Sequence, residues 1–341
     1  MKHCVVTGGA GFIGSHLAEA LLARGDRVSV VDDESTGTIQ NLSGVLDHPD
    51  LSYTKGSVAD RPLIRSLLAD ADEVYHMAAA VGVALIASSP VRTIETNIYP
   101  TELLLEELAQ RHAGGHRVKL FLASTSEVYG KNPKPQWHEE EDLVFGPTTR
   151  PRWSYGVSKA IDEFLALAYC REQGLPVVVG RFFNVVGPRQ TGAYGMVLPR
   201  FVEAALKGGP LVVHDDGRQV RCFAHVSDVI RAVLALMDTP RAVGQVFNIG
   251  SDQPVSILEL AREVIAAVGG PLEIRFQSYA EAYSEDFEDC RRRVPDLTRL
   301  RSTIHFQPRY GLKETIREVV RWKRHQFLQS PPPGDAPRGT P

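Results

Sequence analysis

Short apolar runs rich in β-branched residues alternate with segments of helical periodicity through the first half of the chain. The runs predicted to form strands cover residues 4–6, 28–31, 74–77, 120–123 and 177–179. The segments predicted to form helices cover residues 15–24, 62–68, 101–111 and 154–171. This alternation predicts an α/β fold in which a doubly wound parallel sheet carries helices on both faces.

The pattern loosens beyond Asn184, where glycines and prolines multiply. At 341 residues the chain exceeds what one core usually supports, so we expect two lobes with a cleft between them. Residues 1–184 are predicted to form the sheet domain, and residues 185–329 a smaller C-terminal α/β lobe that partly interleaves with it. The Pro/Gly-rich residues 330–341 are predicted to be a disordered tail.

The composition is that of an ordinary globular protein, with 43% hydrophobic and 23% charged residues. A formal net charge of -3 provides no basic field for nucleic acid or for an anionic membrane surface. Small-molecule partners are therefore favoured.

The four cysteines lie far apart and form neither a CxxC pair nor the dense spacing of a secreted disulfide scaffold. They are expected to be free thiols in a reducing cytoplasm. Residues 1–6 lead directly into a glycine-rich turn and leave no room for a signal peptide, and no apolar run reaches transmembrane length. We therefore expect a cytoplasmic protein without membrane contact.

A histidine followed by four acidic residues, His138 and residues 139–142, has the composition of a metal cluster. Consecutive carboxylates point in different directions and usually form a solvated face. No metal site is predicted.

Gly9, Gly11 and Gly14 form a Gly-x-Gly-x-x-Gly motif between the first predicted strand and the first predicted helix. Glycines there allow a tight turn and a close approach to a pyrophosphate, whose charge the helix N-terminus stabilises. The alternative is a turn that merely connects strand and helix. The cofactor contacts predicted for this turn are Gly8, Gly11, Phe12, Ile13 and Gly14.

Asp32 ends the second predicted strand, eighteen positions after Gly14. A carboxylate at this place accepts hydrogen bonds from the adenosine ribose hydroxyls and repels a 2′-phosphate. No arginine follows immediately, so NAD is expected in preference to NADP.

Tyr155 and Lys159 lie four residues apart at the start of a predicted helix, which places the phenol and the ammonium on one helix face. A neighbouring cation and a positive nicotinamide ring would lower the pKa of the phenol and make it a better base. The alternative is a surface pair without function. The loop Ser124-Thr125-Ser126-Glu127 follows the fourth predicted strand, at the sheet edge where α/β folds bind ligands.

With these motifs, the chain from residue 5 to about residue 322 resembles the extended short-chain dehydrogenase/reductases, the NAD-dependent epimerase/dehydratase family with a Rossmann fold. The resemblance implies that Tyr155 is the catalytic base and that Lys159 binds the nicotinamide ribose. It also implies that Thr125 or Ser126 holds the reacting sugar oxygen, and that the enzyme is a homodimer with a UDP-sugar as substrate.

Further positions follow from the same resemblance. Ala78 is expected in the loop beside the cofactor, and Asn97 on the helix near the active site. Ser57 and Val58 are expected at the adenine pocket, where the family often has an aspartate before the valine and this chain has a serine. Pro100 stands where a glycine is frequent, a departure without an interpretation from sequence.

Glu127 distinguishes between the reactions of the family. Dehydratases usually carry an Asp-Glu pair in this loop, whereas this chain has Ser126-Glu127, and simple 4-epimerases usually have a small neutral residue at the second position. Glu127 therefore indicates additional proton chemistry. Its alternative interpretation is a carboxylate at the loop edge that faces solvent.

The loop and the segment 151–155 look like the UDP-glucuronate decarboxylase branch of the family, as do Tyr283, Phe287 and the arginines of segment 291–296. In that segment Arg293 aligns best with a catalytic arginine, and a guanidinium fork suits a carboxylate. The alternatives are a solvated basic turn or a contact with the UDP pyrophosphate.

The expected function is NAD-dependent decarboxylation of UDP-glucuronate through oxidation at C4, giving a UDP-pentose or a UDP-4-keto-pentose. The alternatives are a UDP-glucuronate or UDP-hexose 4-epimerase and, more remotely, a dinucleotide-sensing protein without catalysis. The substrate contacts expected from the resemblance, each with a core or loop role as its alternative, are Asn97, Asn184, Arg189, Arg221 and Arg293.

Overall fold

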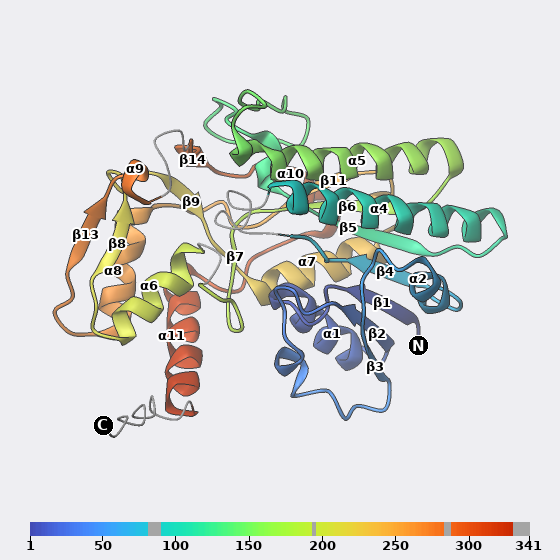
Figure 1. Ribbon diagram of the computed structural model, residues 1–341, viewed down its shortest axis with the longest axis horizontal. Coiled ribbons are helices and arrows are strands. Elements are labelled where there is room, and N and C mark those ends of the chain that lie inside the picture. Colours follow the sequence, from blue (N-terminus) through green and yellow to red (C-terminus); the bar gives the residue numbers. More distant parts are fainter. Residues whose placement is uncertain (81–89, 193–195, 283–287, 330–341) are drawn as a thin grey trace, which may run out of the picture.

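A seven-stranded parallel sheet forms the centre of the computed structural model, which describes residues 1–80, 90–192, 196–282 and 288–329 (Figure 1). The predictions for Tyr283, Phe287 and residues 330–341 lie outside the described residues. All strand pairs of the sheet are parallel, in the order β11-β6-β5-β4-β1-β2-β3. The strands are β1 His3–Thr7, β2 Arg27–Asp32, β3 Leu51–Lys55, β4 Glu73–His76, β5 Lys119–Thr125, β6 Val177–Phe182 and β11 Val246–Ile249.

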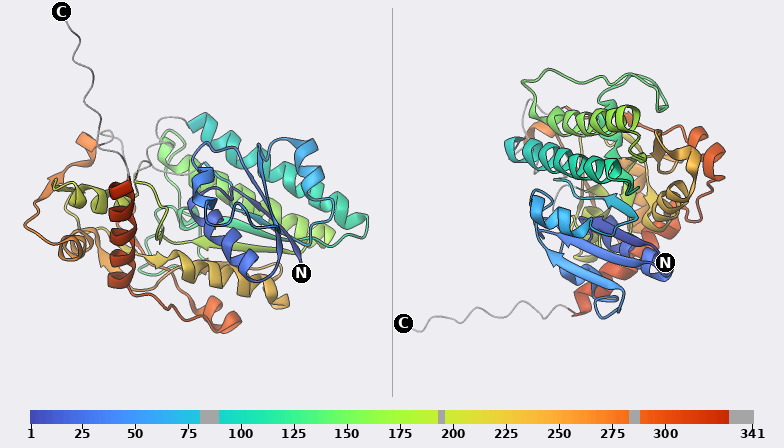
Figure 2. Two further views of the ribbon diagram at one scale, coloured as in Figure 1. Left: turned by 90° about the horizontal axis from the view of Figure 1, so that it is seen from below. Right: turned by 90° about the vertical axis from the view of Figure 1, so that its right-hand side faces the viewer.

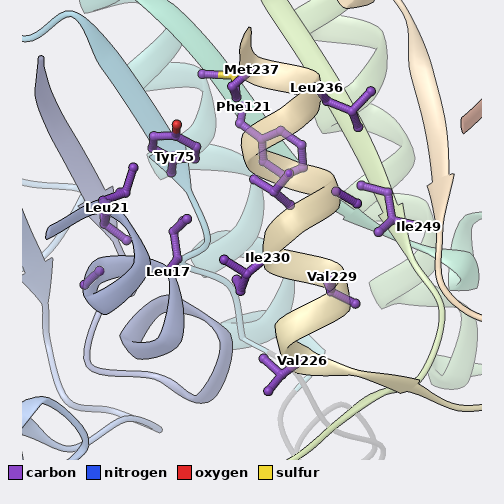
Figure 3. Close-up of a cluster of buried hydrophobic side chains, with 14 of the residues drawn as sticks. Leu17, Leu21, Tyr75, Phe121, Val226, Val229, Ile230, Leu236, Met237 and Ile249 are labelled. Carbon is purple, nitrogen blue, oxygen red and sulfur yellow. The ribbon is translucent and has the colours of Figure 1, made fainter. Parts of the chain in front are cut away.

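Helices cover both faces of this sheet, which confirms the predicted doubly wound α/β fold. On one face Leu17 and Leu21 meet Val226 and Ile230 over apolar side chains of the strands (Figure 3). On the other face three helices enclose a second apolar cluster. The helices are α1 Phe12–Ala23 and α7 Val226–Asp238 on the first face, and α2 Arg61–Leu67, α4 Pro90–Ala113 and α5 Ser154–Gln173 on the second.

Two strands of the sheet and part of one helix were not predicted. Strand β3 lies at the sheet edge with partly exposed polar residues, so it lacks a buried apolar run. Strand β11 comes from the late, glycine-rich part of the chain and pairs with β6. Helix α4 begins at Pro90, eleven residues before its predicted start at 101, and contains Pro100 in its interior.

A second group of elements packs around its own apolar cluster, which joins helices α6, α8 and α11 (Figure 1). The chain crosses between the large sheet and this second group more than once. Helix α7 and strand β11 follow Asn184 in the sequence, yet both belong to the sheet domain. The division at residue 184 stays a prediction. The strands here are β7 Val185–Val186, β8 Leu211–His214, β9 Val220–Cys222, β10 Ala224–His225, β12 Pro254–Ser256, β13 Ile274–Gln277 and β14 Arg292–Arg293. The helices of this group are α6 Val197–Leu206, α8 Ile257–Val268, α9 Tyr279–Ala282 and α11 Leu312–Gln329. Helix α10 Thr298–Ile304 packs instead against α7 and β11 of the sheet domain. The 3₁₀ turns of the described chain are η1 Ile39–Leu42, η2 Ser126–Tyr129, η3 Pro151–Trp153 and η4 Pro240–Ala242.

Candidate active site

A cavity of about 460 Å³ opens at the carboxyl ends of the sheet strands. Its wall combines the β1–α1 turn, the ends of β2 and β5, the start of α5 and residues of the second group of elements. Ligands of α/β folds bind at this edge of the sheet, and the cavity is large enough for a small organic molecule.

The glycine turn is shaped by close backbone contacts. A Cβ on Gly14 would lie 2.2 Å from the Gly8 carbonyl oxygen. Gly8 has a φ of +66°, and a Cβ there would lie 2.7 Å from the backbone nitrogen of Ala78. No side chain caps helix α1 at Gly11, so its first amides remain available. The cavity wall includes Gly8, Gly11, Phe12, Ile13 and Gly14. This cradle fits a dinucleotide pyrophosphate.

Asp32 fixes the turn to the end of β2. One carboxylate oxygen accepts the amide of Ala10 at 2.9 Å, and the other accepts the amide of Glu34 at 2.8 Å. The side chain is buried at the cavity wall beside Asp33. The remaining lone pairs of Asp32 can accept hydrogen bonds from ribose hydroxyls, and the negative charges of Asp32 and Asp33 disfavour a 2′-phosphate.

Three further residues predicted to contact the cofactor, Ser57, Val58 and Ala78, also line the cavity. The Ser57 hydroxyl accepts the amide of Ala59 at 3.1 Å. The nearby carboxylate of Asp60 is occupied as the N-cap of α2. The β3–α2 turn therefore presents the Ser57 side chain to the cavity, and the carboxylate nearby is used within the turn.

Tyr155 lies at the start of α5 with its side chain buried at the cavity wall. Burial raises the pKa of its phenol and the charge of Glu127 raises it further, while a hydrogen bond with Thr125 lowers it. Lys159, one turn later, has its ammonium 2.8 Å from the carboxylate of Asp162. The lowering of the phenol pKa expected from Lys159 is therefore not found in the protein alone, because Asp162 compensates the ammonium charge.

The loop after β5 brings two hydroxyls and a carboxylate to the same wall. The Thr125 hydroxyl caps η2 by accepting the amide of Glu127 at 3.2 Å, and Ser126 is buried beside it. Gly156 of α5 packs directly on this loop, since a Cβ there would lie 2.5 Å from the Glu127 carbonyl oxygen. This contact holds Thr125, Ser126 and Tyr155 around one end of the cavity.

Glu127 is bound by two guanidinium groups. One carboxylate oxygen lies 2.6 Å from Nη1 of Arg152, and the other lies 2.7 Å from Nη1 of Arg293. Although burial acts to raise it, the two arginine charges hold the pKa of Glu127 well below its usual range. The alternative of a solvent-facing loop carboxylate is wrong, because the Glu127 side chain is only 14% exposed.

Arg152 was not predicted as a site residue. It forms part of η3, directly before α5, and its side chain is buried at the cavity wall. Arg152 stands three residues before Tyr155 in the sequence. That spacing alone does not predict that its side chain pairs with Glu127.

Two predicted substrate contacts lie away from the cavity wall of the described residues. Asn97 is buried in α4, where it accepts the amide of Ala80 at 2.8 Å and donates to the Ser158 hydroxyl at 3.2 Å. Arg189 donates to Ser15 at 3.2 Å and pairs with Glu19 at 2.5 Å. Neither side chain is part of the described cavity wall, which differs from the direct contact expected.

Asn184 and Arg221 do line the cavity. The Asn184 amide donates to the Cys222 carbonyl at 3.0 Å, and Arg221 pairs with Asp289 at 2.8 Å. Strands β9 and β14 place Arg221 beside Arg293 in register. Sequence reasoning missed further polar wall residues that belong to no motif: Gln190, Arg200, His214, Gln219, Tyr279 and Asp289.

Within residues 1–80, 90–192, 196–282 and 288–329, no three metal-ligating side chains come together. None of the helices in these ranges is both long and apolar enough to cross a membrane.

Comparison with known proteins gives a consistent result. Residues 4–250 match the family model described as NAD dependent epimerase/dehydratase family. The chain is 38% identical over 327 residues to a UDP-N-acetyl-alpha-D-glucosaminuronate decarboxylase of Bacillus cytotoxicus, covering 95% of this chain and 98% of that protein. It is 33% identical over 326 residues to UDP-glucuronic acid decarboxylase 1 of Arabidopsis thaliana, covering 95% of this chain and 70% of that protein.

The solved structures similar to the chain include the UDP-glucuronic acid 4-epimerase from Bacillus cereus, crystallised in complex with UDP-glucuronic acid and NAD. The TM-score is 0.85 at 26% sequence identity, and the match covers 95% of this chain and 99% of that chain.

Proposed function

Because the chain belongs to the NAD-dependent epimerase/dehydratase family, we propose that it decarboxylates UDP-glucuronate after oxidising the sugar at C4. NAD is the cofactor of this enzyme family, and the glycine cradle with Asp32 fits it. A UDP-uronate with an N-acetyl group is a second candidate substrate, favoured by the similarity to the Bacillus cytotoxicus decarboxylase. Both sugars carry the carboxylate on which the proposed reaction depends.

The observation that carries this proposal is the pair of arginines around Glu127, at the same cavity wall as Tyr155. Two guanidiniums and one carboxylate leave one net positive charge in a buried place. A sugar carboxylate would balance that charge, whereas the hydroxymethyl group of a neutral hexose would not.

The first step uses the loop after β5 and the start of α5. Bound NAD supplies the hydride acceptor for C4 oxidation. Tyr155, as the phenolate, is proposed to take the proton of the C4 hydroxyl, and the hydroxyl of Thr125 or Ser126 to hold the C4 oxygen by a hydrogen bond. Lys159, whose ammonium pairs with Asp162 and is not part of the described cavity wall, is proposed to bind the nicotinamide ribose.

Oxidation at C4 makes the C6 carboxylate a β-keto acid. The bond between C5 and C6 then breaks, carbon dioxide leaves, and the electron pair passes into the C4 ketone as an enolate. Arg152 and Arg293 are proposed to orient the carboxylate, and the enolate takes up a proton at C5. Return of the hydride to C4 gives a UDP-pentose, whereas release before that step gives a UDP-4-keto-pentose.

The UDP group is proposed to lie along the second group of elements. Arg200 of α6 and Arg221 of β9 line the cavity there and offer positive charge for a diphosphate. Tyr279 and Asn184 are proposed as neighbouring contacts.

We also propose a homodimer. Helices α4 and α5 lie side by side on the outside of the sheet (Figure 2). They expose large apolar side chains, among them Val91 (67% exposed) and Phe164 (65%). The α5 residues Val157, Ile161 and Phe164 follow helical spacing and form one stripe. A second copy presents the same surface, so a two-fold axis would bury both.

A cytoplasmic location is part of the proposal. All four cysteines are free thiols, two of them far inside the protein at Cys4 and Cys222. Reduced cysteines are typical of that compartment.

Product analysis tests the proposed reaction. The protein is incubated with NAD and UDP-glucuronate, and the nucleotide sugar is identified by proton NMR. A UDP-pentose or its 4-keto form supports decarboxylation, and UDP-galacturonate would mean 4-epimerisation. Parallel incubations with UDP-glucose, UDP-N-acetylglucosamine and the N-acetylated uronate assign the substrate class. If none of these sugars is converted, the dinucleotide-sensing alternative gains support.

A further inference from the structure

Glu127 uses both of its carboxylate oxygens on the two arginines. Each oxygen receives one guanidinium nitrogen, at 2.6 Å from Arg152 and 2.7 Å from Arg293. The side chains of Arg152 and Arg293 are only 7% and 10% exposed. Among the described residues, the buried Nε groups of both arginines lack a hydrogen-bond partner, and Nη1 of Arg152 meets Glu127 as an ion pair without hydrogen-bond geometry. The cluster is therefore neither balanced in charge nor complete in hydrogen bonds.

No other acid of the described neighbourhood is free to balance the arginines. The charge of Asp289 acts on both, but its carboxylate already binds Arg221 at 2.8 Å and the Tyr279 hydroxyl at 2.9 Å. Tyr155 faces Glu127 as a neutral phenol whose pKa is raised. A carboxylate that enters the cavity would meet the same guanidiniums that now bind Glu127.

We propose that Glu127 holds, in the enzyme without substrate, the place that the sugar carboxylate takes between Arg152 and Arg293. Binding of a uronate then exchanges one ion pair for another and releases Glu127 from at least one arginine. This inference rests on the proposed function and adds a role for Glu127 as a specificity-determining residue.

The exchange explains how a neutral sugar is rejected. A hydroxymethyl group offers no negative charge, so it cannot replace Glu127 on a buried guanidinium. Separating the pair without a substitute would leave a buried charge uncompensated, which is strongly unfavourable. The released Glu127 has fewer positive neighbours, so its pKa rises toward the usual range and it becomes able to accept or donate a proton.

The test measures binding with turnover stopped. Calorimetry is performed with the NAD-loaded Tyr155→Phe variant, with absence of NADH formation checked by absorbance, and with the Tyr155→Phe/Glu127→Gln double variant. Removing the internal competitor is expected to lower the dissociation constant of UDP-glucuronate by about tenfold, because a buried ion pair of Glu127 no longer has to be broken. The dissociation constant of UDP-glucose is expected not to fall.

Two matched variants separate exchange from a general charge effect. Glu127→Asp keeps the carboxylate and should leave the preference for UDP-glucuronate near its starting value. Glu288→Gln removes an acid close by, which pairs with Lys131 and accepts from Trp153 rather than binding the two arginines. It should change neither dissociation constant by more than about twofold.

Each outcome has a defined meaning. Tighter uronate binding in Glu127→Gln, absent in Glu288→Gln, supports the exchange. Unchanged or weaker uronate binding, or an equal gain in Glu288→Gln, overturns it while the proposed function stands. If the parent variant itself prefers UDP-glucose, the proposed function fails.

A second measurement covers the case in which Glu127→Gln does not fold. UDP-xylose is UDP-glucuronate without its carboxylate, and formate supplies that carboxylate as a separate ion. The exchange predicts that formate strengthens UDP-xylose binding to the parent variant, relative to chloride at equal ionic strength, and does not strengthen UDP-glucose binding. Equal affinity for UDP-xylose in formate and chloride would overturn the exchange.

Discussion

Tyr155 and Glu127 have buried side chains at the same cavity wall but opposite electrostatic surroundings. Burial raises the pKa of the phenol, whereas two guanidiniums lower the pKa of the carboxylate. At neutral pH the carboxylate is therefore ionised and the phenol is protonated. The proton chemistry proposed for C4 oxidation belongs to Tyr155, and it depends on a lower pKa of the phenol in the NAD-loaded enzyme.

Replacement of Tyr155 by phenylalanine is expected to slow NADH formation from UDP-glucuronate about 10³-fold, within the usual range for general base catalysis. NAD affinity should remain, because the pyrophosphate cradle and Asp32 are untouched. Stopped-flow absorbance and calorimetry measure the two effects. Tyr169→Phe, on the same helix but outside the cavity wall, is the control. Turnover near that of the unmodified protein would remove Tyr155 from the mechanism.

The pH dependence follows from the direction of the phenol pKa. The active form of a base is deprotonated, so the rate of C4 oxidation is expected to rise with pH through the neutral range and to level off above the pKa of the loaded enzyme. Glu127 stays ionised in this pH range, so it does not change the pH dependence of the rate before substrate binds. Single-turnover NADH formation between about pH 6 and 9 measures the profile, and a rate that falls with rising pH contradicts the assignment.

Asp32 is expected to make NAD bind more tightly than NADP by roughly tenfold or more, because a 2′-phosphate would meet its carboxylate and that of Asp33. Calorimetry with both dinucleotides measures the ratio. Asp32→Asn should reduce the ratio of NAD to NADP affinity, while its amide oxygen can still accept the backbone amide of Ala10 or Glu34. Tighter binding of NADP to the unmodified protein would overturn the assignment.

At the scale of single residues, the sequence identified the wall residues that stand in motifs. It did not reveal the ion-pair cluster of Glu127, Arg152 and Arg293, because the three side chains come from η2, η3 and β14 and meet only in the folded chain. The same limit applies to Arg189, which was expected to contact the substrate but pairs with Glu19 of α1.

Among the elements, the strands with buried apolar runs were predictable and the edge strand β3 was not, since none of its side chains is fully buried. The turn from β1 to α1 was predictable for a steric reason. Its glycines mark places where the backbone passes too close to other backbone for a side chain. This turn therefore offers a direct test of how the cofactor cradle is built.

Gly14→Ala is expected to destabilise the protein by about 3 kcal/mol and to weaken NAD binding, because the new Cβ would lie 2.2 Å from the Gly8 carbonyl oxygen. Gly44→Ala is the control, since the nearest atom to its Cβ is a flexible side-chain oxygen of Glu19 at 3.6 Å. Thermal unfolding and calorimetry report both effects. Equal behaviour of the two variants would mean that the close contact at Gly14 is not what shapes the cradle.

For the whole molecule, the outward faces of α4 and α5 predict association of two copies (Figure 2). The unmodified protein is expected to sediment as a dimer at micromolar concentration, and Phe164→Asp to shift it toward the monomer, because a carboxylate replaces an apolar side chain at the proposed contact. Phe276→Asp, an exposed phenylalanine on β13, is the control and should leave the dimer intact. A monomer in the unmodified protein would contradict the proposal.

The two groups of elements meet around one cavity, where the glycine turn, a buried phenol and two guanidiniums lie on a common wall. The most direct test of the proposed reaction follows the carbon that it removes. UDP-glucuronate labelled with ¹³C at C6 is incubated with the NAD-loaded protein and followed by ¹³C NMR. We expect the carboxylate resonance to disappear as labelled carbon dioxide and bicarbonate appear in equal amount, with an unlabelled UDP-pentose or its 4-keto form left behind. Label that remains in a UDP-uronate after conversion would contradict decarboxylation.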